Sequence, residues 1–325
     1  MQLLDLPAEI RETIYRIITE PSSNRRILED NYIRYDYRPA LALSSINRQI
    51  YIESRKVFLT ENVFVKIETP FDEASRHVAA DGHVPIIATG RAADTFALHA
   101  MTVAISCPNY QVHDQDRRFI IHLDDLPKFT ATWQYSHLSY PQLNESLVLH
   151  LKLRDPTTRN DWQEPILAKA LQLRLLMPFG AVKHLCDFGV SGSPQPLSSI
   201  VKELKARQAE PYPSPEQCLR EAEKLKEQGN VKVKEARYEE ALECYRQSWL
   251  AMHIVISGRQ RHVHADAFYG ATLEEREYQG QQGHAVRLVL RVNLVANTVL
   301  CYLKLGDYDV KDSPTRCYVD AKTVC

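Results

Sequence analysis

The sequence lacks the cysteine spacing of a disulfide framework or a zinc ribbon. Its seven cysteines include no C-x-x-C pair, and their number is odd. A dispersed, odd set favours a reducing compartment. No apolar run approaches the roughly 20 residues that a membrane helix needs, and the N-terminus, MQLLDLPAEIRE, lacks the basic region of a secretory signal. We therefore expect the protein in the cytoplasm, the nucleus or both.

The chain also lacks a charge excess of either sign. Its 40 basic residues nearly balance its 41 acidic ones, so no global field draws the chain to nucleic acid or to a membrane surface. Charged residues make up 25% of the sequence and apolar residues 44%, which is ordinary for a globular protein. With 325 residues, the chain is long enough for two domains or for one domain with an appendage.

Catalytic and metal-binding motifs are absent as well. There is no glycine-rich phosphate loop, nucleophile elbow or H-E-x-x-H motif. His262-x-His264-x-Asp266 could contribute to a zinc site, but no third nitrogen or sulfur donor is placed nearby, so a solvated loop is favoured. We expect no metal, no cofactor and no enzymatic activity.

An enzyme that uses the middle of the chain remains a distant alternative. Cys107 and Cys186 with His184 could be imagined as a nucleophile pair, although one sequence does not show that they meet. Asp124 and Asp125 could be paired acids, but aspartates before Leu-Pro more simply indicate a turn and a helix start. A deep pocket with converging polar side chains in this region would favour the enzyme.

The first segment, residues 1–67, is predicted to be mainly helical. Asp5 can cap a helix that has Pro7 in its first turn. The isoleucines at 10, 14, 17 and 18 then form one apolar stripe. A second helix is indicated by the spacing of Leu43, Ile46, Ile50, Val57 and Phe58, and Asn62–Ile67 alternates like a strand.

Three blocks of this segment, in order, resemble the F-box-like module common in fungal proteins. They are Leu6-Pro7-x-Glu9-Ile10-x-x-x-Ile14-Tyr15, then Ile46-Asn47-Arg48-Gln49-Ile50, then Phe58-Leu59-Thr60-Glu61-Asn62-x-Phe64. The resemblance implies docking on the Skp adaptor of a cullin ubiquitin ligase, with Leu6, Pro7, Ile10 and Ile14 as contact residues. The alternative is that the isoleucines only pack on the following helix.

The middle segment, residues 68–205, reads as a small unit of strands and helices. Met101–Ser106 and Phe119–Leu123 are short apolar runs. Leu147–Arg154 alternates leucines with mostly polar residues, which predicts a half-buried strand. Helical spacing follows over Trp162–Met177, and Val182–Val190 returns to strand.

A linker at residues 206–215 separates this unit from a helical region at 216–308. Ser214, Pro215 and Gln217 together form a predicted capping box with proline at the first helical position. From Glu216 the pattern predicts a helical hairpin whose turn is Glu235-Ala236-Arg237.

Glycine inside the first of these two helices needs an explanation, because it costs a helix about 1 kcal/mol relative to alanine. Leu225, Gly229 and Val233 share one side of the first helix. The second helix carries Tyr238, Ala241, Leu242, Tyr245 and Trp249 at helical spacing. We predict that the missing side chain at 229 admits a bulky ring of the second helix.

This pattern of large and small residues on two helices resembles the tetratricopeptide repeat. The consensus positions are taken by Leu225, Gly229, Tyr238, Ala241 and Tyr245, and Ser248 replaces the usual final alanine. A second copy of the first helix of the repeat follows at residues 286–308, where Tyr302, Gly306 and Tyr308 match the consensus. A long insert at 257–285 lies between the two copies. The expected fold class is α+β: an F-box-like helical module, a mixed α+β middle unit and C-terminal all-α tetratricopeptide hairpins.

The resemblance also implies a ligand. In co-chaperones of this family, a lysine and two asparagines at repeat positions matched by Lys226, Asn230 and Asn297 grip the terminal carboxylate of a chaperone tail. The family clamp takes two more residues from a third repeat that this sequence does not show. The alternative is that Asn230 belongs to the repeat consensus without a role in binding, and that Lys226 is a solvated surface charge.

The last segment, residues 309–325, departs from the repeat pattern and is expected to be an atypical tail. Lys311 stands where an alanine is expected, and Pro314 interrupts the next turn. The helix before it, Val286–Leu305, is apolar nearly all round, so it needs neighbours on two sides, and one side has no evident occupant. We expect a truncation, an alternative splice or a retained intron, and a chain that associates.

The favoured function is a non-enzymatic, intracellular protein-interaction adaptor. In one version, the F-box-like module recruits ubiquitination machinery and the rest of the chain selects a target. In the other, the repeats dock a chaperone tail. Both versions expect protein partners, with no nucleic acid and no membrane.

Overall fold

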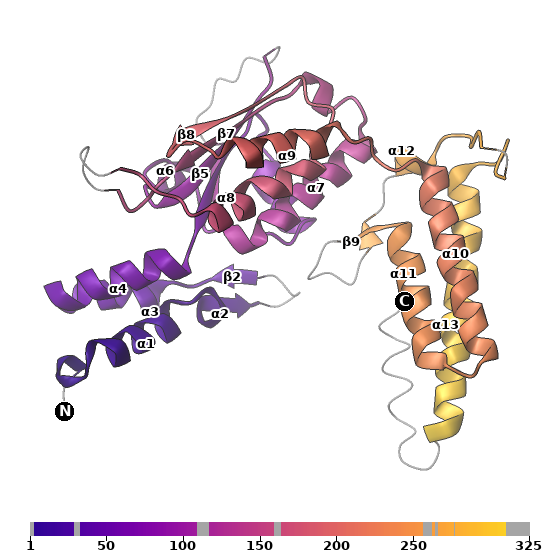
Figure 1. Cartoon of the computed structure of the whole chain (residues 1–325), viewed down its shortest axis with the longest axis horizontal. Helices are drawn as coiled ribbons and strands as arrows, with labels where there is room; N and C mark the ends of the chain where they lie inside the picture. Colours follow the sequence, from indigo (N-terminus) through magenta and orange to yellow (C-terminus); the bar gives the residue numbers. More distant parts are fainter. Residues whose placement is uncertain are drawn as a thin grey trace. The chain divides into compact units, whose positions relative to one another are not determined.

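The computed structural model describes residues 3–28, 33–108, 117–158, 164–255, 262–263, 266–275 and 277–309. The chain divides into two compact units, Met1–Gln134 with Gln142–Glu210 (unit 1) and Tyr135–Pro141 with Pro211–Cys325 (unit 2). The fold is mixed α+β, as expected: helices at the N-terminus, a six-stranded mixed sheet in the middle and helices towards the C-terminus (Figure 1).

The N-terminal part of unit 1 is helical, with one small hairpin. Its elements are α1 (Ala8–Thr19), α2 (Pro21–Asn24), β1 (Arg25–Ile27), β2 (Ile33–Tyr35), α3 (Arg38–Ala42) and α4 (Arg48–Glu61). The side chain of Asn47 caps α4 by accepting a hydrogen bond from the backbone N–H of Ile50 at 2.9 Å. Helix α1 follows Pro7, which occupies its N-cap position and makes no side-chain cap bond, and the predicted cap by Asp5 stays a prediction.

The isoleucine stripe of α1 does not form its buried face. Ile10 is 49% exposed and Ile17 is 59% exposed, whereas Arg11, Tyr15 and Thr19 are buried. The reason is a polar contact with α4: Glu53 accepts hydrogen bonds from the Arg11 guanidinium at 2.7 and 2.9 Å and from the Tyr15 hydroxyl at 3.1 Å. This Arg11–Glu53–Tyr15 network leaves Ile10 and Ile17 towards the solvent, while Ile14 is half-buried and Ile18 packs against the buried clusters below the helix.

A six-stranded sheet forms the middle of unit 1. Its strands are β3 (Phe64–Glu68), β4 (Ala88–Thr89), β5 (His99–Ser106), β6 (Arg118–His122), β7 (Val148–Arg154) and β8 (Asp187–Ser193). Their order is β4-β6-β3-β5-β7-β8, with β3–β5 and β7–β8 parallel and the other neighbours antiparallel. The runs expected at 62–67, 101–106, 119–123 and 147–154 therefore all lie in strands of one sheet.

Helices pack on the sheet and enclose the main core. The helices of this part are α5 (Ala74–Ala80), α6 (Gly90–Asp94), α7 (Leu126–Ser139), α8 (Lys169–Leu176) and α9 (Ser198–Ala209). Leu149, Leu151 and Leu153 of β7 belong to the same buried cluster as Leu126 of α7 and Leu176 of α8. Helix α8 begins seven residues after the predicted Trp162; the segment just before it contains Pro165, a poor helix residue.

Two further boundaries differ from the sequence prediction. Strand β8 begins at Asp187 rather than at Val182, and His184 in between has a φ of 59°, outside the strand region. Helix α9 runs to Ala209, into the range expected to be linker.

Aromatic side chains join the N-terminal helices to the sheet. Tyr37, Phe58 and Phe64 contact one another with ring centroids 5.5–6.0 Å apart. They form a buried cluster with Ile120 of β6 and Ala93 of α6. The expected boundary at residue 67 falls inside β3, a strand in the interior of the sheet.

Unit 2 is mainly helical. Its elements are α10 (Pro215–Lys234), α11 (Tyr238–Ala251), β9 (Ile254–Val255), β10 (His262–Val263), α12 (Asp266–Tyr269) and α13 (Gly283–Asp309). The predicted capping box is confirmed: Ser214 Oγ accepts from the Gln217 backbone at 3.2 Å, and Gln217 Oε1 accepts from the Ser214 backbone at 3.0 Å. The predicted turn is also confirmed, with Ala236 at a φ of 58°.

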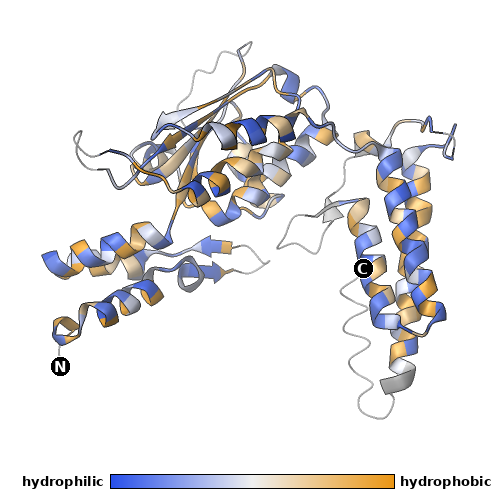
Figure 2. Ribbon diagram, in the orientation of Figure 1, coloured by the Kyte–Doolittle hydropathy of each residue, from blue (hydrophilic) through white to orange (hydrophobic). Residues whose placement is uncertain are grey.

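Helix α13 is unusually apolar. Orange residues run along it in Figure 2, while α10 beside it is largely blue. Gly283–Gly306, 24 residues that include an 18-residue window with a mean hydropathy of 1.5, is long and apolar enough to cross a membrane by length and composition. The statement that no such run exists was therefore wrong, although one helix of this kind is weak evidence, because core helices pass the same test.

Candidate functional site

The crossing of α10 and α11 is built around Gly229. A Cβ placed on Gly229 would lie 3.0 Å or less from three ring atoms of Tyr245, Cε1, Cδ1 and Cζ. Tyr245 is 2% exposed and Ala241 is fully buried. The glycine is thus required by the close approach of the aromatic ring, and the predicted fit of Gly229 against the second helix is confirmed.

The hydroxyl of the same tyrosine connects three helices. Tyr245 Oη donates to Asn230 Oδ1 at 2.8 Å, and Asn297 Nδ2 of α13 donates to the same oxygen at 2.9 Å. Burial raises the pKa of the Tyr245 hydroxyl to about 12, so the hydroxyl keeps its proton and stays a donor at neutral pH. Two donors on one carbonyl oxygen fix the orientation of the Asn230 amide.

Other positions of the hairpin meet the packing prediction to different degrees. Buried Ser248 donates its hydroxyl to the backbone carbonyl of Ala222 at 2.5 Å, which satisfies the polar group that replaces the expected alanine. The remaining predicted packing residues that the structure describes are half-buried: Leu225, Tyr238, Tyr302 and Gly306. The side chain of Tyr308 lies outside the described part.

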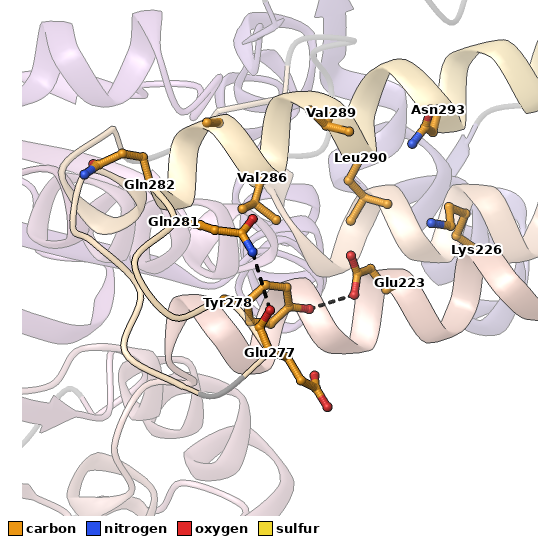
Figure 3. Close-up of a pocket in the computed structure, with 11 residues that line it drawn as sticks. Glu223, Lys226, Glu277, Tyr278, Gln281, Gln282, Val286, Val289, Leu290 and Asn293 are labelled. Atoms are coloured by element: carbon orange, nitrogen blue, oxygen red, sulfur yellow. Dashed lines mark hydrogen bonds between the residues drawn. The ribbon is translucent and has the colours of Figure 1, made fainter.

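A groove of about 700 Å³ lies beside this network. Its walls come from α10, from α13 and from the segment that precedes α13 (Figure 3). Val286, Val289 and Leu290 of α13 supply apolar surface, and the polar lining comes from Glu223, Lys226, Glu277, Gln281, Gln282 and Asn293. Tyr278 also lines the groove and donates its hydroxyl to Glu223 at 2.8 Å.

Lys226 and Asn293 lie at the same end of the groove, on α10 and α13 respectively (Figure 3). Among the described residues, the ammonium group of Lys226 makes no ion pair and no hydrogen bond, and the amide nitrogen of Asn230 makes no hydrogen bond. One turn of helix separates Lys226 from Asn230. This end of the groove therefore offers a half-buried cation close to a fixed amide donor.

The structure brings only two of the three sequence-predicted clamp residues into direct contact. Asn230 and Asn297 are brought into direct contact, 67 positions apart in sequence. Lys226 lines the groove. Neither asparagine is among the residues that line the groove, because their amide groups meet each other at the helix crossing.

Sequence reasoning missed several residues of the groove. Asn293 lies one turn before Asn297, so the helical period already identified could have found it. Glu223 lies three residues before the predicted Lys226 on α10, on the same side of the helix. Tyr278 and Gln281 come from the insert between the helices, which carries no periodic signal that would place them.

The N-terminal candidate residues are mostly accessible. Pro7 and Ile10 are exposed, and Leu6 and Ile14 are half-buried. Ile17, which lies seven residues after Ile10 and so on the same side of α1, is exposed too. Of the isoleucines that the alternative expected to pack on the following helix, Ile18 packs against the buried cluster that contains Ile50 and Val57, and Ile14 is half-buried, whereas Ile10 is 49% exposed.

The structure describes several of the candidates that were set aside on sequence grounds. Leu123–Asp125 forms a 3₁₀ turn that leads into α7, and buried Asp125 accepts from Tyr35 at 2.9 Å and from Lys128 at 2.9 Å. Cys107 is half-buried and Cys186 is exposed. No group of three or more His, Cys, Asp or Glu suited to a metal occurs among the described residues, and His264 lies outside them.

Comparison of the chain with protein-family models, with curated proteins and with solved structures gives no match.

Proposed function

We propose that the protein is a non-enzymatic protein-interaction adaptor whose unit 2 binds the C-terminus of a partner peptide. The observation that carries the proposal is the geometry of Asn230. Its carbonyl oxygen accepts from Tyr245 and Asn297, while its amide nitrogen is without a partner among the described residues, one turn from the unpaired ammonium of Lys226.

A terminal carboxylate fits this arrangement chemically. It needs a cation and fixed N–H donors in one place, and charge-assisted hydrogen bonds of this kind are about twice as strong as neutral ones. Lys226 supplies the cation and Asn293 supplies an amide donor, both from the groove lining. The Asn230 amide nitrogen, one turn from Lys226 but outside the lining, is proposed as a second donor. The apolar surface of Val286 and Leu290 then receives the side chains that precede the carboxylate.

The tetratricopeptide resemblance leads to the same ligand class. The hairpin α10–α11, with Gly229 against Tyr245, supports this reading of the region. The family clamp adds a lysine and an arginine from a third repeat, which the described residues do not supply. We therefore expect micromolar rather than nanomolar binding, because part of the charge on the carboxylate is left unpaired.

The acidic residues of the groove set a preference for the peptide sequence. Glu223 and Glu277 flank the apolar wall, so acidic side chains upstream of the carboxylate would be repelled and basic ones attracted. A basic peptide with a free terminal carboxylate is the expected ligand.

The test is isothermal titration of the full chain with apolar–basic peptides that end in a free carboxylate. Amidation of the peptide terminus is expected to abolish measurable binding, and Lys226→Ala is expected to weaken it at least tenfold. Lys224→Ala is the matched control, since Lys224 lies on the same helix and is not among the groove-lining residues. Equal affinity for the free and amidated peptides would contradict the proposal.

A second surface supports the adaptor role at the other end of the chain. Ile10 and Ile17 present exposed apolar side chains on one side of α1, although this helix is held on α4 by a buried polar network. The F-box-like resemblance implies that this surface docks on a Skp-type adaptor. In this proposal, unit 1 recruits a cullin ubiquitin ligase and unit 2 selects its target.

Co-purification with a Skp-type adaptor tests this second surface. Ile10→Asp is expected to abolish the interaction, because it places a charge in the apolar contact. Ala8→Asp introduces the same charge at an exposed position of α1 about 160° around the helix from Ile10, and is expected to have a smaller effect. Co-purification that Ile10→Asp leaves unchanged would exclude this docking mode.

A further inference from the structure

Strand β8 is the last strand in the order of the six-stranded sheet, so one of its two edges has no neighbouring strand in the part of the chain that the structure describes. The backbone N–H of Asp155 donates to the carbonyl of Ser193 at 3.2 Å, which continues the β7–β8 ladder and places the backbone groups of Ser193 on the β7 side. Because backbone direction alternates along a strand, the backbone groups of Phe188, Val190 and Gly192 point to the unpaired edge.

This edge lacks the features that usually protect an edge strand. Such strands are very short, or they carry lysine, proline or a bulge that discourages pairing with another chain. Strand β4, at the opposite end of the sheet, has two residues, whereas β8 has seven and contains neither lysine nor proline. Its register with β7 is continuous from Asp187 to Ser193. The edge is therefore long and regular enough to accept another strand.

Positive charge gathers on the polar face of the sheet beside this edge. His150, Lys152 and Arg154 of β7 are exposed and share that face. Lys152 and Arg154 make no ion pair and no hydrogen bond with the described residues. The neighbours of Lys152 in the register are uncharged, Thr102 on β5 and Ser191 on β8. Two cations without a counter-charge therefore lie one strand away from the unpaired edge.

Small residues on β8 let these cations reach the edge. After its first residue, the polar face of β8 carries only small side chains: Gly189, Ser191 and Ser193. The ring of His150 already lies across β8, because its Nε2 is 2.7 Å from Ser191 Oγ and a Cβ on Gly189 would lie 2.9 Å from its Nδ1. Lys152 and Arg154 have longer side chains on the same face, so they can extend over the serines to the edge.

We propose that the free edge of β8 binds an extended, acidic segment of a partner protein, which adds to the sheet as an outer strand antiparallel to β8. The backbone of this segment pairs with the outward groups of Val190 and Gly192. Its acidic side chains lie on the polar face, where Lys152 and Arg154 meet them. In this mode of recognition, main-chain hydrogen bonds supply affinity, and alternate side chains supply specificity.

The opposite face of the added strand is expected to be apolar. Phe188 and Val190 of β8 pack against the main core of unit 1 on the side of the sheet that the helices cover. Residues of the segment that lie beside them would continue this apolar row. The expected ligand therefore alternates acidic and apolar residues, which is the pattern of a strand with one polar and one buried face.

A second copy of this chain is the competing occupant, and its charges fit less well. Pairing of two β8 edges would bring one carboxylate, Asp187, from each copy, against the two cations Lys152 and Arg154. Asp187 Oδ1 already accepts from the backbone N–H of Phe188 at 2.8 Å. A segment with acidic residues at alternate positions balances both cations, so charge complementarity favours it. The proposal concerns unit 1 and is independent of the peptide-binding function of unit 2.

The test is fluorescence anisotropy of the full chain with a peptide that alternates valine and glutamate over about seven residues, the length of β8. The peptide carries fluorescein at its N-terminus and an amide at its C-terminus, so it lacks the terminal carboxylate proposed to bind unit 2. We expect micromolar binding, and binding about tenfold weaker or less when lysine replaces glutamate, because the peptide then repels Lys152 and Arg154.

Two double variants locate the contact. Lys152→Glu with Arg154→Glu should weaken binding of the glutamate peptide by about tenfold or more, since it reverses the charge beside the edge. Lys202→Glu with Lys205→Glu is the matched control and should leave binding unchanged. These two lysines are exposed on α9, which packs on the apolar face of the sheet through Ile200 and Leu204. Circular dichroism verifies that each variant is folded.

Strand addition is tested on the peptide, which leaves the protein unchanged. In an antiparallel addition, the valines present their N–H groups to β8, whereas the N–H groups of the glutamates point to the solvent. N-methylation of the valines should therefore abolish binding, and N-methylation of the glutamates should leave it unchanged. Equal effects of the two methylations, an equal loss in the α9 control, or no binding of the unmethylated peptide would each overturn the proposal. A dimer of the full chain that excess peptide dissociates in sedimentation equilibrium would assign the edge to a second copy and overturn it as well.

Discussion

Strand β7 and helix α13 each bury one face, but they present opposite surfaces to the solvent. In β7, Leu149, Leu151 and Leu153 are buried, and the alternate residues His150, Lys152 and Arg154 are exposed and polar. In α13, Leu290 and Leu294 are buried, and the residues on the far side, such as Leu288 and Val292, are apolar as well. The sheet face is complete as it stands, whereas the described residues leave one side of the helix uncovered.

The difference matters because single exposed apolar residues are ordinary, but a continuous apolar face is not. In unit 1, a stretch that alternates apolar and polar residues has a polar face of its own to present to the solvent. Helix α13 specifies two apolar sides, and α10 and α11 cover one of them. The comparison therefore separates the residues that hold α13 in its unit from those available to a second partner.

The largest expected effect is the difference in stability between truncating a leucine on the buried side of α13 and truncating one on its exposed side. Leu294→Ala is expected to destabilise unit 2 by about 3 kcal/mol, since Leu294 is 2% exposed and its loss leaves a cavity. Leu288→Ala removes the same atoms from a side chain that is 56% exposed, and should change stability by less than about 0.5 kcal/mol. Urea unfolding measures both.

Equal losses from the two leucines would show that the side of α13 that carries Leu288 is covered within one chain. In that case, the contrast between β7 and α13 would disappear.

The next effect concerns the glycine at the α10–α11 crossing. Gly229→Ala should be destabilising by about 2 kcal/mol, because the overpacking against the Tyr245 ring exceeds the roughly 1 kcal/mol that alanine gains in a helix. In a Tyr245→Ala background, the same change should be stabilising, since the ring is gone. Urea unfolding of the four proteins gives the coupling energy directly.

A destabilising Gly229→Ala in both backgrounds would mean that the ring is not the cause. The glycine would then have to be explained by something other than the close contact seen here.

Much of the local structure could be predicted from the sequence, because short-range patterns determine it. The capping box at Ser214, the turn at residues 235–237 and the alternation of β7 depend on residues a few positions apart. The packing of Gly229 against Tyr245 also follows from local pattern, since the two helices are joined by a three-residue turn. The absence of an evident occupant on one side of α13 was visible in the same way.

The errors arose where distant residues decide the outcome. The periodicity of α1 pointed to its isoleucines, but Glu53 on α4 draws Arg11 and Tyr15 inward instead. The groove depends on Tyr278 and Gln281, whose place is set by the path of an insert and not by any period. Asn230 and Asn297 were matched by resemblance, and their direct hydrogen bond became visible only once α13 was placed beside α10. The F-box-like and tetratricopeptide assignments stay predictions.

A smaller effect is expected from the hydroxyl that links the three helices of unit 2. Tyr245→Phe keeps the ring against Gly229 but removes one of the two donors to Asn230 Oδ1. We expect a loss of about 1 kcal/mol, the usual net value of one hydrogen bond. Comparison with Tyr269→Phe, whose hydroxyl donates to the Met252 carbonyl at 3.3 Å, provides a control in the same unit.

If Tyr245→Phe weakens peptide binding without a matching loss of stability, the hydroxyl acts mainly by orienting the Asn230 amide. If it changes neither, the three-helix network contributes nothing measurable and the site depends on Lys226 alone.

The smallest effect distinguishes the two units by pH. Hydrogen bonds from Arg11 lower the pKa of the Glu53 carboxyl from 4.5 to about 2, so the stability that Glu53 contributes is complete above pH 4.5 and is lost as the pH falls towards 2. The Arg246 pair lowers the pKa of Glu243 on α11 to about 2 as well, but the Glu243 side chain is 55% exposed, against 27% for Glu53. Solvent screening makes such an exposed pair worth little.

Urea midpoints between pH 6 and pH 2 should therefore show less acid sensitivity in Glu53→Gln than in the wild type, while Glu243→Gln follows the wild type. Parallel curves for all three proteins would remove the Arg11–Glu53–Tyr15 network as the contact that holds α1 on α4, and exposed Ile10 would then need another explanation.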